Sequence, residues 1–145
     1  SVVWLHMGQL SRIGVAIDSD LLEKFDGLIA RRGYTNRSEA FRDLIRGELV
    51  EETWSKPDSQ VVGTVTLVYD HHVRLLNEKL TGMQHEHYDH ILSTLHVHLD
   101  HDNCLEIVAV RGRASRIREV FQRLKAIKGM KHVALAAGTT GARLP

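Results

Sequence analysis

The stretch LHVHLDHDNCLE at residues 95–106 decides the fold of the second half of this chain. Its first half alternates with the two-residue period of a β-strand, so His96 and His98 share one face. Residues 100–103 favour a turn, and Cys104 begins a return strand. An antiparallel hairpin with His98 opposite Cys104 brings two imidazoles and one thiol into one patch. The opposite face of the first strand, which we expect to be the core side, carries Leu95, Val97 and Leu99.

This patch offers three ligands of a four-ligand metal site. The fourth ligand is expected to be a histidine near the end of the preceding helix. The spacing leaves open whether it is His85, His87 or His90, and whether it belongs to the same chain. Three nitrogens and one thiolate suit Zn(II), Cu(II) or Ni(II). The alternative is a set of surface histidines beside a small apolar cysteine, but eight of the ten histidines fall between residues 71 and 101, which favours the metal site.

The rest of the second half alternates between strand and helix patterns. We expect, in order, strand 61–69, helix 71–84, strands 91–99 and 104–110, helix 115–128, strand 131–136 and a loose tail at 138–145. This βαββαβ order is that of a ferredoxin-like domain, so the expected fold class is α+β. Residues 53–60 contain Pro57 and small polar residues and are predicted to form a hinge. The two domains are therefore expected at 10–52 and 60–138.

The first fifty residues predict a strand followed by two helices. Residues 12–17 alternate in strand period, and Asp18 or Ser19 can cap a first helix that ends at Gly33. Residues 36–39 resemble a capping box for the second helix, with Asn36 as the cap and Glu39 reaching back. A unit of this size buries little core alone, and a lone strand leaves its backbone groups unpaired. Both problems are solved if two chains pair their strands, so we expect an intertwined dimer.

Antiparallel pairing of two such strands produces a ribbon whose outer face shows Arg12, Gly14 and Ala16. A two-stranded ribbon fits the major groove of DNA, where Arg12 can bind guanine and Ala16 can touch a thymine methyl group. Gly14 only allows close approach. The amides near Arg37 and Ser38, at the start of the second helix, can hold a phosphate. The alternative is a dimerisation module that binds no DNA.

Two acidic residues of the second helix form a candidate site for a second cation. Glu39 and Asp43 lie four residues apart on one helical face, where like charges are mildly destabilising. Either Arg42 and Arg46 offset this repulsion, or a cation sits between the two carboxylates.

The whole chain has 145 residues and a formal net charge of +1, so bulk charge gives no sign of a nucleic-acid partner. No apolar run approaches the ~20 residues that a membrane-spanning helix needs, and residues 1–7 are too short for a signal peptide. A single cysteine fits a reducing cytoplasm. A metalloenzyme needs an open coordination position and a general base. The candidate bases, Glu86 and Glu106, lie in no recognisable catalytic motif, so we expect no enzyme.

Three stretches resemble the nickel-responsive ribbon-helix-helix repressors: LLEKF at 21–25, RGYTNRSEA at 32–40 and the hairpin at 95–106. The resemblance runs from about Arg12 to His132, and the hairpin motif is its most specific part. It implies a square-planar Ni(II) site formed by His96, His98 and Cys104 of one chain with His85 of a neighbouring chain.

The resemblance also implies an assembly. The expected homotetramer is a dimer of dimers, with ferredoxin-like, ACT-type regulatory domains at its centre and a dimer that binds operator DNA at each end. A second cation, often K(+), is expected near Glu39 and Asp43. Family members usually carry hydroxyl side chains where this chain has Gly14 and Ala16, so the resemblance does not imply an operator sequence. The rival interpretations are a zinc- or copper-responsive regulator of the same architecture and an amino-acid-binding regulatory DNA-binding protein.

Overall fold

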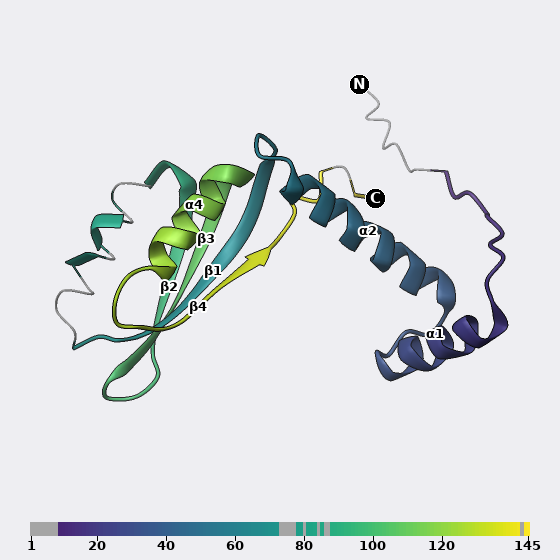
Figure 1. Cartoon of the computed structure of the whole chain (residues 1–145), viewed down its shortest axis with the longest axis horizontal. Coiled ribbons are helices and arrows are strands. Elements are labelled where there is room, and N and C mark those ends of the chain that lie inside the picture. The colour runs from purple at the N-terminus through teal and green to yellow at the C-terminus, as the bar shows by residue number, and fades with distance from the viewer. Residues whose placement is uncertain (1–8, 73–77, 80, 84, 86–87, 143) are drawn as a thin grey trace, which may run out of the picture. The chain divides into compact units, whose positions relative to one another are not determined.

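The computed structural model describes residues 9–72, 78–79, 81–83, 85, 88–142 and 144–145 (Figure 1). The chain forms two compact units. The first spans Ser1–Gly47 together with Gly141–Pro145, and the second spans Glu48–Thr140. No helix in the described part of the chain is long and apolar enough to cross a membrane.

The N-terminal unit contains α1 (Ser19–Arg31) and the first part of α2 (Arg37–Ser55). The predicted caps of both helices are confirmed. The Asp18 side chain accepts hydrogen bonds from two amides of the first turn of α1, and Asn36 Oδ1 accepts one from the Glu39 amide at 2.9 Å. Gly33 follows the end of α1 with a φ of 81°, a left-handed conformation that glycine adopts without strain. The Glu39 carboxylate does not reach back as predicted, because it pairs with Arg42 instead.

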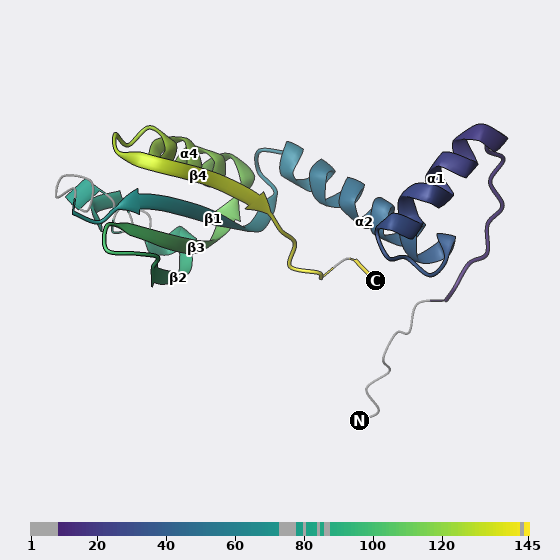
Figure 2. The ribbon, with the colours of Figure 1, turned by 90° about the horizontal axis from the view of Figure 1, so that it is seen from below.

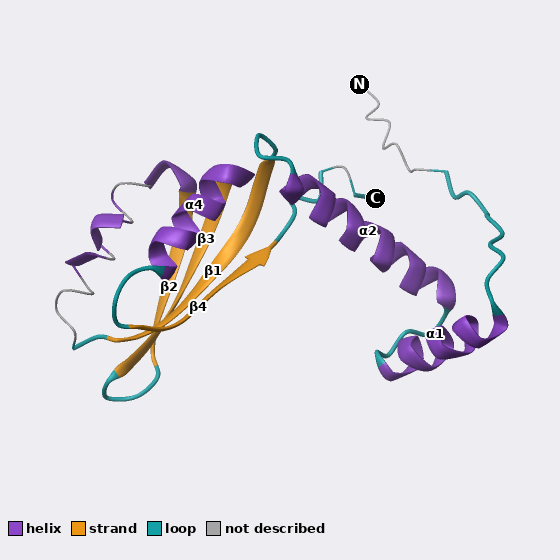
Figure 3. Cartoon of the chain, in the orientation of Figure 1, coloured by secondary structure: helices purple, strands orange, loops and turns teal. Residues whose placement is uncertain are grey.

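The two helices of this unit meet through a small apolar contact. The rings of Phe25 and Phe41 stack with centroids 5.1 Å apart, and Ile29 and Ala40 are buried. Ahead of α1, residues 9–18 form neither a helix nor a strand (Figure 3). The predicted strand at 12–17 is therefore absent from the single chain, and Ile13 is 81 % exposed. A strand gains its hydrogen bonds only from a neighbouring strand, and the described residues of this unit provide none.

Helix α2 is longer than the sequence predicts, so the expected hinge at 53–60 is reduced to residues 56–59. The cause is Trp54, which is only 3 % exposed and donates a hydrogen bond from Nε1 to the Gly138 carbonyl oxygen at 3.0 Å. Burial of a large aromatic side chain favours continuing the helix to this position. Pro57 then prevents its extension. Because Gly138 accepts this bond, the tail predicted from residue 138 is held in place at its start.

The second unit is built on a four-stranded antiparallel sheet. Its strands are β1 (Gln60–Asp70), β2 (Ile91–His98), β3 (Asn103–Arg113) and β4 (Met130–Ala137), and they lie in the order β2-β3-β1-β4 (Figure 2). Helix α4 (Ala114–Lys125) follows β3 directly and packs on one face of the sheet (Figure 1). This mixture of helices and an antiparallel sheet confirms the predicted α+β class.

The segment between β1 and β2 differs from the predicted helix 71–84. His71 and His72 form a turn after β1, so the helix does not begin there. Residues 78–79, 81–83 and 85 are helical, and the rest of the prediction lies outside the described residues. A short 3-10 helix, η1 (Tyr88–His90), leads into β2. The turn at His71 is fixed by a hydrogen bond from its amide to the Asp102 carbonyl oxygen at 3.0 Å.

The core lies on the face of the sheet that α4 covers. Fully buried side chains from the two central strands and α4 meet there, namely Val65, Leu67, Cys104, Val108, Val110 and Ile117. Cys104 is opposite His98 in the β2–β3 register, so His98 lies on this covered face and not on the open one. The expectation that Leu95, Val97 and Leu99 face the core is wrong for the single chain, because they lie on the open face and are 58 %, 38 % and 52 % exposed.

Candidate metal centre

The β2–β3 hairpin has the register that the sequence predicts, with His98 opposite Cys104 and His96 opposite Glu106. Its loop is fixed by Asp100. The Oδ1 atom of Asp100 accepts hydrogen bonds from the amides of Asp102 and Asn103, each at 2.8 Å. These bonds, together with those from the Asn103 side chain, lower the pKa of Asp100 to about 2. The loop therefore holds the two strands in register without help from a ligand.

Three ligand atoms converge at the start of β3. The Nδ1 atoms of His71 and His98 each lie 3.4 Å from Cys104 Sγ, and the three atoms are within 4.8 Å of one another. Cys104 is fully buried, and burial raises the pKa of its thiol, with Glu106 adding to the effect. A metal ion binds the thiolate and releases this proton. The chemistry of this donor set, two imidazoles and a thiolate, fits a borderline divalent ion.

His96 lies on the same face as His98, with the two ring centroids 5.3 Å apart. Its Nδ1 atom is 3.9 Å from Glu106 Oε2, and the same oxygen accepts a hydrogen bond from the Tyr69 hydroxyl at 2.8 Å. Burial, with the Glu106 contact, raises the pKa of Tyr69 well above its usual range. Glu106 is thus a buried carboxylate engaged by a tyrosine beside the metal patch, which is the place of an orienting group and not that of an exposed general base. The other candidate base, Glu86, lies outside the described residues.

The structure does not bring the three candidate fourth ligands to this cluster. His85 is exposed on the helical segment and belongs to no group of metal-ligand atoms among the described residues. His90 lies in η1, with its ring against Gly112. His87 is outside the described residues.

The residue that sequence reasoning missed is His71. The β1–β3 register places Tyr69 opposite Cys104, so the turn after β1 must lie beside the hairpin loop. The pattern of the sequence predicts each strand but not which strands are neighbours.

The residues predicted to bind DNA lie in the N-terminal unit. Arg12, Gly14 and Ala16 are exposed in the extended segment before α1. Ser38 is exposed in the first turn of α2. Arg37 instead bridges to α1, donating hydrogen bonds from Nε and Nη2 to the two carboxylate oxygens of Asp26 at 2.8 and 2.7 Å. This pairing lowers the pKa of Asp26 and engages the Arg37 guanidinium.

The two acidic residues of the candidate cation site each have a cationic partner on α2. Glu39 pairs with Arg42, and Asp43 pairs with Arg46 at 3.0 Å. Asp43 also accepts a hydrogen bond from the Tyr34 hydroxyl at 2.6 Å, which lowers the pKa of the Asp43 carboxyl. Of the two ways to offset like charges at this spacing, the arginine pairs are the one present in the chain.

Comparisons with known proteins agree on the family. Residues 62–137 match the NikR C terminal nickel binding domain, and residues 11–52 match the ribbon-helix-helix protein, copG family. A protein of Solibacter usitatus described as "Putative nickel-responsive regulator" is 72% identical over 138 residues, which cover 95% of this chain and 99% of that protein. A protein of Geobacter sulfurreducens with the same description is 56% identical over the same shares. The chain belongs to the family of nickel-responsive ribbon-helix-helix transcription regulators, which are not enzymes.

A solved structure is similar in fold alone. The structure of uncharacterized protein TM1266 from Thermotoga maritima superimposes with a TM-score of 0.50 and 13% sequence identity. The match covers 54% of this chain and 96% of that one.

Proposed function

We propose that this chain is a nickel-dependent transcriptional repressor, which binds operator DNA through its N-terminal domain when Ni(II) is held by its C-terminal domain. The observation that carries the proposal is the hairpin pair, with the Cys104 sulfur 3.4 Å from the His98 nitrogen and His96 beside it. Thiolate and imidazole ligands together suit Ni(II), and the family match rests on the same domain. A DNA-binding role and a reduced cysteine also suit the cytoplasm.

We infer that the ligand set is three histidines and one cysteine shared between chains: His96, His98 and Cys104 from one chain and His85 from a neighbouring chain. The exposure of His85, and its distance from the in-chain cluster, support this division, because an exposed imidazole is accessible to a second chain. Within one chain, His71 is the imidazole nearest to the sulfur besides His98. The bound ion would supply positive charge that stabilises the buried thiolate.

The open face of the sheet supports a tetrameric assembly. Its edge strand β2 and the residue after it expose four large apolar side chains, Leu92, Leu95, Val97 and Leu99. A cluster of this kind on a soluble domain marks an interaction surface, and a second copy of the same surface is the simplest partner. The antiparallel sheet with helices on one face supports the ferredoxin-like, ACT-type assignment of this domain. Pairing of residues 12–17 between chains would then join two such dimers into a dimer of dimers.

DNA recognition is assigned to the paired ribbon. Arg12, Gly14 and Ala16 would face the major groove, and Ser38 with the first amides of α2 would hold a phosphate. The Arg37–Asp26 pair suggests that Arg37 stabilises the helix pair and contributes less to phosphate binding than its position implies. A cation at Glu39 and Asp43, K(+) or another, is part of the same proposal and must compete with two arginine partners.

Metal and DNA are coupled if both bind the same arrangement of the assembly more tightly than any other. Ordering of the helix that carries His85 and of the hairpin would then bias how the DNA-binding dimers are placed. By linkage, the operator must tighten nickel binding by the same factor as nickel tightens operator binding.

The deciding experiment is an operator-binding assay with the full chain in Ni(II), Zn(II), Cu(II), Co(II) and chelator. We expect tight binding in Ni(II) and loss of binding in chelator. The sulfur–nickel absorption band should accompany it, a signal that Zn(II) does not give. Tighter binding in Zn(II) or Cu(II) would overturn nickel dependence in favour of the rival metal. Binding restored in chelator by an amino acid would overturn metal sensing altogether.

A further inference from the structure

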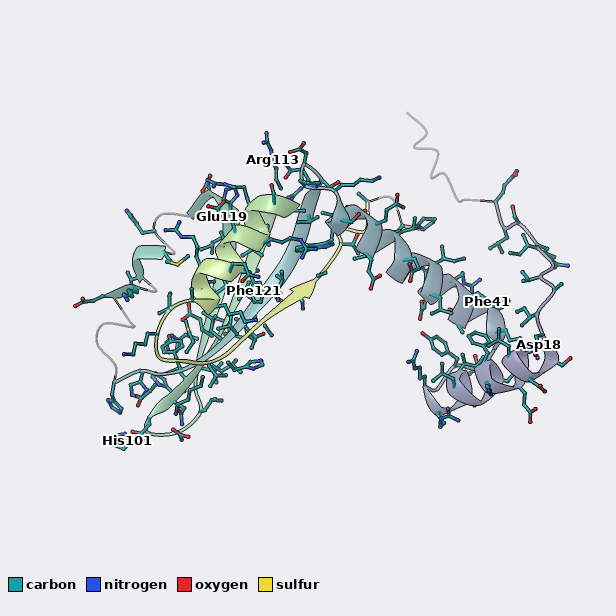
Figure 4. All side chains as sticks on the ribbon, in the orientation of Figure 1. Asp18, Phe41, His101, Arg113, Glu119 and Phe121 are labelled. Atoms are coloured by element: carbon teal, nitrogen blue, oxygen red, sulfur yellow. The ribbon has the colours of Figure 1, made fainter. Side chains whose placement is uncertain are left out.

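A second group of metal-ligand atoms lies at the tip of the β2–β3 hairpin. It consists of His72, from the turn after β1, with His101 and Asp102 from the hairpin loop. The His72 Nε2 atom is 3.3 Å from His101 Nδ1 and 3.4 Å from Asp102 Oδ1, and the latter two atoms are 3.7 Å apart. Figure 4 labels His101 at this tip. All three side chains are exposed, and none belongs to the Cys104 cluster.

These distances match the edges of a metal coordination polyhedron. Imidazole and carboxylate ligands lie about 2.0–2.2 Å from Zn(II), so two ligand atoms of a tetrahedral site are about 3.3–3.6 Å apart. The three separations at the hairpin tip fall in or just beyond this range. Two imidazoles and one carboxylate also form a known three-ligand set that leaves the remaining positions of the ion to water.

The backbone around the three ligands is held independently of any ion. Asp100 fixes the loop through the amides of Asp102 and Asn103. The His72 amide donates a hydrogen bond to Asp70 Oδ1 at 2.9 Å, and the His71 amide bonds the Asp102 carbonyl oxygen. The turn after β1 and the hairpin loop are therefore tied together before binding. Little further ordering of the backbone is needed to form the site, which lowers its entropic cost.

We propose that His72, His101 and Asp102 form a second site for a borderline divalent metal ion, contributed by one chain and separate from the Cys104 centre. It contains no thiolate, is open to water and must release the contact of His72 Nε2 with the His101 carbonyl oxygen, which is 3.0 Å long. Its affinity is therefore lower than that of a four-ligand site with sulfur. The proposal does not depend on nickel sensing, since it needs neither His85 nor a second chain.

The position of this site gives it a connection to the first one. His71 and His72 are consecutive, and their ring centroids are 4.1 Å apart. His71 contacts Cys104 while His72 contacts His101, so one turn carries a ligand for each cluster. An ion at the tip fixes this turn against the hairpin loop. We expect it to slow the release of metal from the Cys104 centre.

The test counts bound nickel per chain by equilibrium dialysis with elemental analysis, using the full-length protein at rising Ni(II) concentration. His101→Ala and Asp102→Asn should each lose one weakly bound ion per chain while keeping the sulfur–nickel absorption band. Cys104→Ser should lose the band and keep the weak ion. His132→Ala is the matched control, because His132 is an exposed histidine of β4 outside both groups, and it should bind as the wild type does.

The outcomes separate this proposal from the function proposed above. If His101→Ala and Asp102→Asn bind as many ions as His132→Ala, the second site does not exist. If Cys104→Ser loses the weak ion as well, the two clusters are a single site and the proposal is overturned. Failure of nickel to promote operator binding would refute the sensor while leaving the ion count, and hence the second site, unaffected. Circular dichroism of each variant verifies the fold.

Discussion

Cys104 is the residue on which nickel binding depends most. Its sulfur is the only thiolate source in the chain, and it is buried between His71 and His98. Loss of an outer-shell partner of a metal ligand typically costs 10–100-fold in affinity, so we expect Cys104→Ser to weaken nickel binding by more than about 100-fold. The sulfur–nickel band should vanish. The metal-free variant should keep its circular dichroism spectrum, because the surrounding core is apolar. A variant that unfolds without metal would instead make the site structural.

Asp100 gives the hairpin loop a dependence on acid. Its pKa is about 2 in the folded chain against an ordinary value of 3.8, so the ionised side chain stabilises the fold above pH 4. This stabilisation must decline as the pH falls from about 4 to 2, because the carboxylate then takes up a proton in both states. We therefore expect Asp100→Ala to be less stable than wild type at pH 6, with the difference shrinking toward pH 2. Urea unfolding at several pH values measures it, and a pH-independent difference would contradict the assignment.

At the level of elements, the end of α2 is anchored to the sheet by Trp54. Its ring lies against Gly63, where an added Cβ would be 3.1 Å from the ring and 2.8 Å from the Ala136 carbonyl oxygen. Trp54→Ala should lower the free energy of unfolding by about 3–5 kcal/mol, the usual cost of removing a buried aromatic side chain. Trp54→Phe, which keeps a ring but loses the bond to Gly138, should cost only about 1 kcal/mol more than the packing change. Thermal unfolding of both variants would compare them, and equal costs would show that the hydrogen bond is the main contribution.

Elements whose pattern is local could be predicted from the sequence, and those that depend on distant partners could not. The caps at Asp18 and Asn36 and the register of His98 with Cys104 follow from residues close together in the chain. The burial of the wrong face of β2 was predicted because a strand's period gives two faces without saying which one the helices cover. His71 was missed for a related reason, since its approach to Cys104 requires knowing that β1 and β3 are neighbours. The continuation of α2 into the expected hinge depends on Gly138, more than eighty residues away.

For the whole molecule, the exposed apolar residues of the open sheet face connect assembly to metal binding. Leu95 is 58 % exposed in the single chain, and a charge placed there would have to be buried if a second copy covers this face. We expect Leu95→Glu to halve the mass of the assembly in analytical ultracentrifugation, while Leu95→Met, which keeps an apolar side chain, leaves it unchanged. Because His85 is assigned to a neighbouring chain, Leu95→Glu should also weaken nickel binding although the ligands of the hairpin are intact. If the assembly dissociates and nickel affinity stays at the wild-type value, His85 is not a shared ligand. If the mass is unchanged, this face is not the interface, and the tetramer must form through another surface.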